Sequence, residues 1–92
     1  MISLKYVKTF LRVDDDADDD VITALIDTSV SYCRGAIGEN VDFDEPRVEL
    51  LQCMYIADMY DNRTAYSKKG SYSLAVSAML AQLRLEYEED IV

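Results

Sequence analysis

The chain of 92 residues contains no histidine, only one proline and three glycines. The missing histidine removes the commonest general base, and two cysteines without a histidine cannot complete a zinc site. So few prolines and glycines leave little material for the turns of an all-β fold. The sequence also has no glycine-rich phosphate loop and no nucleophile elbow. It therefore predicts no catalytic residues, no metal site and no cofactor, and it argues against an enzyme.

Basic residues are also scarce, nine against eighteen acidic ones, and the formal charge is −9. Proteins that wrap nucleic acid need a basic surface to displace counterions, so this balance argues against that function. Cys33 and Cys53 lie in apolar stretches and are expected to be reduced core residues, which favours a reducing compartment. No apolar run approaches the length of a membrane span, and Lys5 and Lys8 interrupt the N-terminal stretch where a signal peptide would be apolar. We expect a soluble, intracellular protein without membrane contact.

The segment DDDADDD, residues 14–20, is the most one-sided stretch of the chain. It is open to three interpretations: a calcium loop, a disordered acidic spacer and the start of a helix. A calcium loop of the EF-hand type needs glycine at position six and glutamate at position twelve. If the loop starts at Asp14, positions six and twelve are Asp19 and Leu25. If it starts at Asp16, position six is Val21, so the glycine is missing again. We therefore interpret the cluster as a helix N-cap, Asp18 or Asp19, surrounded by a strongly negative surface.

Half of the residues are apolar, which is too many for a disordered chain. Their three-and-four spacing predicts helices, with Ser3 as an N-cap, Ile2 and Val7 as a hydrophobic staple, and Pro46 in a first helical turn. The expected ranges are 4–11, 19–37, 46–62 and 74–87. We predict one all-α domain over residues 1–92. It is a small bundle of about four helices (a short N-terminal helix, two long helices and a C-terminal helix) with an extended loop before the last one.

The third and fourth helices are apolar on more faces than a lone domain of this size is expected to cover, which favours a protein–protein interface. The alternative is that the short first helix and Phe43 cover the excess. The last helix has two apolar stripes, and either can face inward on sequence grounds. We assign the inward position to Val76, Leu80, Leu83 and Tyr87. The candidate contacts with a neighbour are then Leu74, Ala78, Ala81 and Leu85.

The loop from residue 63 to 73 carries three positive charges and no acid, whereas the windows 14–20, 39–49 and 86–90 are acidic. We hypothesise that this loop meets an acidic window of a neighbouring subunit, with tyrosines as apolar anchors. The candidate contact residues are Arg63, Tyr66, Lys68, Lys69 and Tyr72. The alternative is a solvated loop whose lysines only aid solubility.

The stretch MISLKYVKTFLRVDDDADDDVITALIDTSVSYCRGAIG combines a short helix ending in Leu-Arg-hydrophobic-Asp, an Asp-rich loop and a long helix that ends near a glycine. In EPRVELLQCMYIADMYDNRTAYS an apolar run ends in Tyr-Asp-Asn-Arg at residues 60–63, and SYSLAVSAMLAQLR forms the closing helix. This order of parts resembles the small head–tail connector proteins (head-completion or adaptor proteins) of long-tailed phages and prophages. The chain departs from the family pattern at residues 71–73, Ser-Tyr-Ser, where the family often has a proline and a glycine. Its link between the second and third helices is also short.

The resemblance implies an α-helical subunit of a homo-oligomeric, twelve-fold ring in the neck of the virion. Such a ring joins the portal protein of the DNA-filled capsid to a downstream neck or tail completion protein. It extends the DNA channel, so DNA passes through without sequence-specific binding. Assembly takes place in the cytoplasm of the host bacterium. The family brings no catalytic residues, and related proteins are often labelled DNA-packaging proteins.

The acidic composition fits a second class of function as well, a monomeric or dimeric acidic binding protein. A DNA mimic that occupies the basic groove of a nuclease or a repressor is an example. The two functions predict different oligomeric states, because a connector needs two unlike surfaces for head-to-tail ring closure. A mimic needs a stable monomer or dimer instead.

Overall fold

The computed structural model describes residues 1–62 and 73–89, which form four helices and no strand. The helices are α1 (Leu4–Leu11), α2 (Asp19–Ala36), α3 (Pro46–Asn62) and α4 (Ser73–Glu89). The bounds of α1 and α3 are those predicted, while α2 ends one residue early and α4 is slightly longer at both ends. The predicted all-α bundle is thus confirmed. Most of the predicted loop before α4 lies outside the described residues.

Local signals explain where α1 begins and ends. The Ser3 hydroxyl accepts a hydrogen bond from the backbone N–H of Tyr6 at 3.1 Å, which satisfies a donor that the first helical turn leaves unpaired. Ile2 and Val7 are both buried on either side of this cap, as the predicted staple requires. The helix ends at Leu11, and the C-cap residue Arg12 has a φ of 62°, in the left-handed region. That conformation costs a non-glycine residue about 1–2 kcal/mol.

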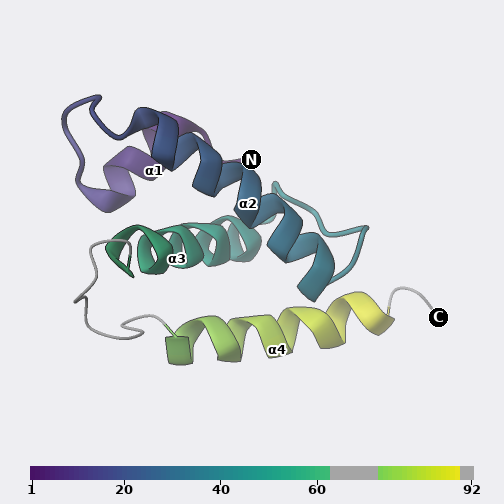
Figure 1. Cartoon of the computed structure of the whole chain (residues 1–92). Coiled ribbons are helices and arrows are strands. Elements are labelled where there is room, and N and C mark those ends of the chain that lie inside the picture. Colours follow the sequence, from purple (N-terminus) through teal and green to yellow (C-terminus); the bar gives the residue numbers. More distant parts are fainter. Residues whose placement is uncertain (63–72, 90–92) are drawn as a thin grey trace.

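α3 runs through the middle of the molecule, with α1 and α2 on one side and α4 on the other (Figure 1). It contributes to two separate hydrophobic clusters. The cluster at the α4 side contains Cys33, Ile37, Val41, Phe43, Val48, Leu51 and Leu83. The cluster at the α1 side contains Ile2, Val7, Ile22, Cys53 and Ile56. We call these the α4 cluster and the α1 cluster. The predicted central position of the third helix is confirmed.

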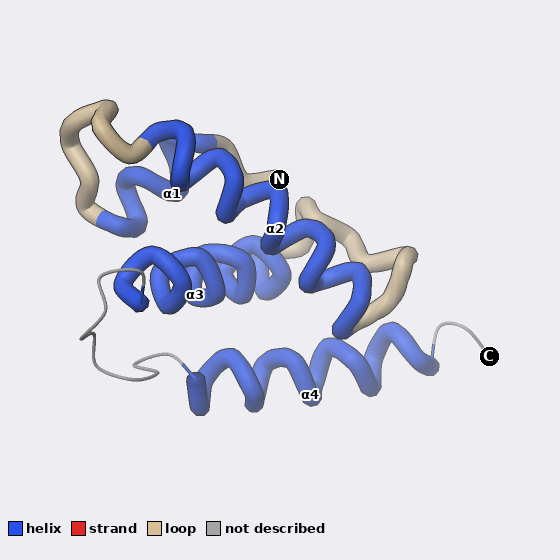
Figure 2. The backbone as a smooth tube through the Cα atoms, in the orientation of Figure 1, coloured by secondary structure: helices blue, strands red, loops and turns tan. Residues whose placement is uncertain are grey.

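An aromatic pair joins α2 to α3. The rings of Tyr32 and Tyr55 stack with their centroids 4.4 Å apart. Leu51 and Met54 are buried and Tyr55 is half-buried, as predicted for this helix. The link between α2 and α3, seen as a tan tube in Figure 2, contains Gly38 with a φ of +148°, a value that favours glycine. None of the helices in the described part of the chain is long and apolar enough to cross a membrane.

Candidate interaction surfaces

The Asp-rich segment leads into α2, and two of its carboxylates contact other helices. Asp18 occupies the predicted N-cap position but makes no side-chain hydrogen bond to the helix backbone. Its Oδ2 instead accepts a hydrogen bond from the Tyr60 hydroxyl at the end of α3. Asp19 is the first residue of the helix, and its Oδ1 lies 2.8 Å from Nζ of Lys8 on α1. The predicted N-cap position of Asp18 is thus confirmed. The predicted capping hydrogen bond from its side chain is wrong, because the carboxylate turns toward Tyr60 on α3.

The remaining aspartates form an exposed negative surface beside α1. The exposed members are Asp14, Asp15, Asp16 and Asp20. Asp15 accepts the backbone N–H of Ala17 at 3.1 Å, which closes a local turn. The Lys8 ammonium donates to the Asp19 carboxylate, and this contact, with the charges of nearby aspartates, raises the pKa of Lys8. Within residues 1–62 and 73–89, no three acidic or cysteine side chains gather in a way that would hold a metal ion.

α4 presents its two apolar stripes in opposite directions. The stripe assigned to the inside packs in the α4 cluster: Val76, Leu80, Leu83 and Tyr87. The described side chains of the second stripe are all exposed: Ala78, Ala81 and Leu85. At 3.6 residues per turn the two stripes are centred about 160° apart around the helix. Leu85 is 63% exposed, and the side chain of Leu74 lies outside the described set. The inward assignment is confirmed, and contact of the outer stripe with a neighbour stays a prediction.

Most apolar residues of α3 are covered within the subunit, whereas Leu50 and Met59 are 44% and 41% exposed. Met54, Ile56 and Ala57 are at most 6% exposed, because α1, α2 and α4 all pack against this helix. The first helix and Phe43 contribute to this cover, which is what the alternative interpretation proposed. The interface argument is therefore wrong for most of α3. It continues to apply to the outer face of α4.

Two polar contacts attach the C-terminal end of α4 to the rest of the subunit. Arg47, at the start of α3, donates two hydrogen bonds of 2.7 Å to the carboxylate of Glu86. This guanidinium lowers the pKa of Glu86. The backbone N–H of Asp42 donates to the Tyr87 hydroxyl at 3.0 Å. Sequence analysis missed these contacts, since no local spacing signals a pair 39 residues apart.

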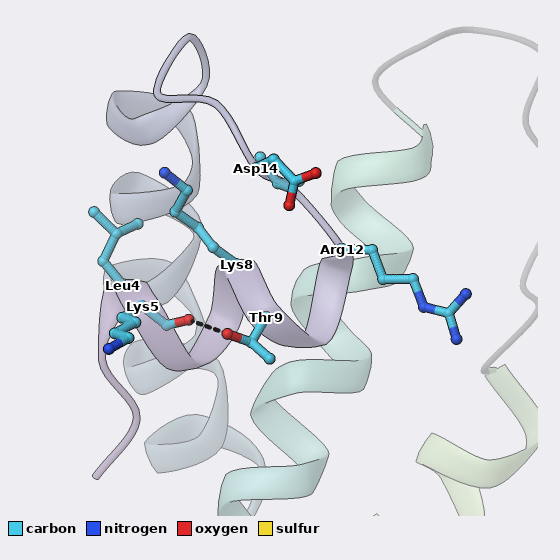
Figure 3. A pocket seen from close by; sticks show the side chains of 7 residues that line it. Leu4, Lys5, Lys8, Thr9, Arg12 and Asp14 are labelled. Carbon is cyan, nitrogen blue, oxygen red and sulfur yellow. Dashed lines mark hydrogen bonds between the residues drawn. The ribbon is translucent and has the colours of Figure 1, made fainter.

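The exposed side of α1 carries two adjoining hollows. The first, of about 440 Å³, is lined by Ser3, Lys5, Tyr6, Thr9 and Phe10. The second, of about 540 Å³, is lined by Leu4, Lys5, Lys8, Thr9, Arg12, Val13 and Asp14 (Figure 3). Figure 3 shows the side chains of Lys5, Lys8 and Arg12 spreading outward from α1 instead of converging on one point. This surface is therefore suited to an extended contact more than to a single small anion. Sequence analysis did not select these residues, although three basic residues and no acid among the first thirteen are a usable signal.

The predicted contact residues of the basic loop lie outside the described residues. They are Arg63, Tyr66, Lys68, Lys69 and Tyr72. The hypothesis that this loop meets an acidic window of a neighbour therefore stays a prediction.

A helical subunit with an exposed apolar stripe on α4 and separate acidic and basic surfaces has the features of a structural interaction protein. Comparison with protein-family models gives a match over residues 1–91 to the family described as "Phage gp6-like head-tail connector protein". The chain belongs to this family, as its resemblance to head–tail connectors indicated. Membership indicates a structural role in the neck of a phage particle. Searches of curated proteins and of solved structures gave no match.

Proposed function

We propose that this chain forms a homo-oligomeric, twelve-fold ring in the phage neck, between the portal protein and the next neck or tail completion protein. The ring extends the channel of the DNA-filled capsid, and DNA passes through it without sequence-specific binding. Assembly takes place in the cytoplasm of the host bacterium, without a cofactor or a catalytic step. The family match over residues 1–91 carries this proposal.

Two properties of the subunit support it. The outer stripe of α4 holds Leu85 at 63% exposure beside two exposed alanines, and contiguous apolar surface of this kind commonly marks a protein contact. The net charge of −9 suits a passage that must not retain DNA, because phosphates bind basic surfaces.

The basic loop from residue 63 to 73 belongs to the same proposal as a second contact between subunits. Its charge complements the acidic windows of a neighbouring copy and would set the register of the contact. Replacing Lys68 and Lys69 with Glu should impair ring formation or docking in low salt, where charge effects are largest, without changing subunit melting. Normal assembly of this double variant would show that the loop is only a connection.

Mass photometry and sedimentation velocity over a series of protein concentrations test the ring itself. We expect a closed species far heavier than the 10.5 kDa subunit, with a central channel visible in electron micrographs. Purified portal protein should bind this species. A protein that stays monomeric or dimeric and does not bind the portal would contradict the proposal and favour the acidic DNA mimic.

A further inference from the structure

Among the helical side chains that the structure describes, Leu85 is the most exposed large apolar one. Its side chain is 63% exposed on the outer stripe of α4, in line with the exposed Ala78 and Ala81. The stripe positions before it are small residues, so the leucine projects beyond them. Burying such a side chain in a partner would remove apolar surface from water at no cost to the subunit core.

A matching hollow lies over α1. The hollow of about 440 Å³ has two aromatic residues in its lining, Tyr6 and Phe10, and Tyr6 is 49% exposed. The lining also includes Lys5 and Thr9 but no acidic residue. Aromatic side chains around a concave surface are a common setting for an apolar anchor of a partner protein.

The charges around the two features are complementary. The first thirteen residues carry three basic side chains and no acid, in a chain that is otherwise strongly negative. Lys8 is already paired with Asp19 of the same subunit, so Lys5 and Arg12 supply the cationic surface. The last turn of α4 has the sequence EYEE from residue 86 to 89 and contains no basic residue, and only Glu86 is paired with Arg47 of the same subunit among the contacts described above. The negative end of a helix dipole repels acidic residues in its own last turn, so this turn is electrostatically better placed beside a cationic surface. Lys5 at the hollow supplies such a surface.

The leucine and the hollow cannot meet within one subunit, because α1 and α4 lie on opposite sides of α3 (Figure 1). Building on the ring proposed above, we propose that Leu85 of one copy inserts into the α1 hollow of the next copy. The contact joins unlike surfaces, so it repeats head to tail and can close into a ring. A second copy of this chain is thus the occupant of the hollow.

Cysteine cross-linking tests this contact directly in the full chain. The native Cys33 and Cys53 are buried and do not interfere. Under mild oxidation the variant that combines Tyr6→Cys with Leu85→Cys should form disulfide-linked ladders beyond the dimer. Each single variant, and the control pair Tyr6→Cys with Leu50→Cys, should not, although Leu50 is also an exposed leucine. Melting curves by circular dichroism verify that every variant is folded.

A second measurement compares two leucine substitutions. Leu85→Ser should raise the protein concentration needed for half-assembly by roughly tenfold or more, whereas Leu50→Ser should change it less than about twofold. If the variant with Tyr6→Cys and Leu85→Cys forms rings but no disulfide-linked ladder, the proposed contact is overturned, while the connector function is not contradicted. Cross-linked dimers alone would show a two-fold contact and overturn the head-to-tail arrangement. Absence of both rings and ladders would contradict the inference and the proposed function together.

Discussion

Ser29 and Gln52 form a polar pair inside the packing of α2 against α3, and neither residue is exposed. Nε2 of Gln52 donates to Oγ of Ser29 at 2.9 Å, and this hydroxyl donates to the carbonyl oxygen of Ile26 at 2.6 Å. A buried polar group that loses its partner costs about 1–3 kcal/mol, whereas replacing both groups with apolar ones is nearly neutral. The pair therefore fixes the relative position of the two helices more than it adds to stability.

We expect Ser29→Ala to lower the free energy of unfolding by about 1–3 kcal/mol, because it leaves the Gln52 amide unpaired. The double variant Ser29→Ala with Gln52→Leu should recover most of this loss. Urea titrations measure the free energy of unfolding of both variants. Ser31→Ala on the exposed face of α2 is the control and should change this free energy by less than about 0.5 kcal/mol. A double variant as unstable as the single one would show that packing, not the unpaired amide, causes the loss.

The two buried thiols predict a loss of stability in alkali. Burial raises the pKa of Cys33, and burial together with Glu49 raises that of Cys53, each to about 11 from an ordinary value of 9.0. The unfolded chain ionises its thiols at lower pH than the folded protein, so their contribution is complete below pH 9 and is lost as the pH rises through 11. The free energy of unfolding should therefore fall across this range.

The variant Cys33→Ala with Cys53→Ala tests the assignment. It should be less stable at neutral pH, because it leaves cavities, but its stability should fall less steeply in alkali than that of the parent. Urea unfolding at neutral pH and in this alkaline range gives the comparison. Equal slopes for the two proteins would assign the alkaline loss to other groups.

At the scale of elements, helix bounds were predictable where the signal is local. Ser3 and its staple set the start of α1, and Pro46 sets the start of α3, because capping acts within one turn of the chain. Contacts between helices leave no such pattern. The bond of Tyr60 to Asp18 joins residues 42 apart in sequence, and it replaced the cap that the aspartates alone suggested.

The orientation of α4, which decides the candidate interaction surface, could not be predicted from the sequence either. Its periodicity revealed two apolar stripes but not which of them faces inward. That choice depends on what α3 and the α2–α3 link present to the helix, including Val48 and Phe43 of the α4 cluster. Only the assembled bundle identifies Leu85 as the exposed member.

Two glycines near the end of α2 should respond oppositely to alanine. Gly35 lies inside the helix, and an added Cβ would meet nothing within 4 Å, so Gly35→Ala should raise stability by about 0.5–1 kcal/mol. Gly38 has a φ of +148°, which strains any other residue, so Gly38→Ala should lower stability by about 1 kcal/mol or more. Thermal denaturation of both variants measures the difference. Changes of the same sign would contradict this account of the helix end.

For the whole molecule, the attachment of α4 predicts a dependence on acid. Arg47 holds the pKa of Glu86 below its ordinary value, so the stabilising contribution of this carboxylate is present above that value of 4.5 and is lost as the pH falls. Glu86→Gln should be less stable than the parent at neutral pH, and the difference should shrink in acid. Glu39→Gln, an exposed control in the α2–α3 link, should have the same stability as the parent both at neutral pH and in acid. A difference independent of pH would contradict the role of the ion pair.

The division of the core into two clusters has a mechanical consequence. Among the described side chains, those of α1 pack only in the α1 cluster and those of α4 only in the α4 cluster, while α2 and α3 belong to both. Local opening of α4 therefore leaves the other cluster intact, and amide hydrogen exchange should be slowest in α3 and faster in α1 and α4. Equal protection of all four helices would show a single cooperative unit instead. In the ring proposed above, a tilt of α4 would change the contact between subunits while the α1 cluster stays packed.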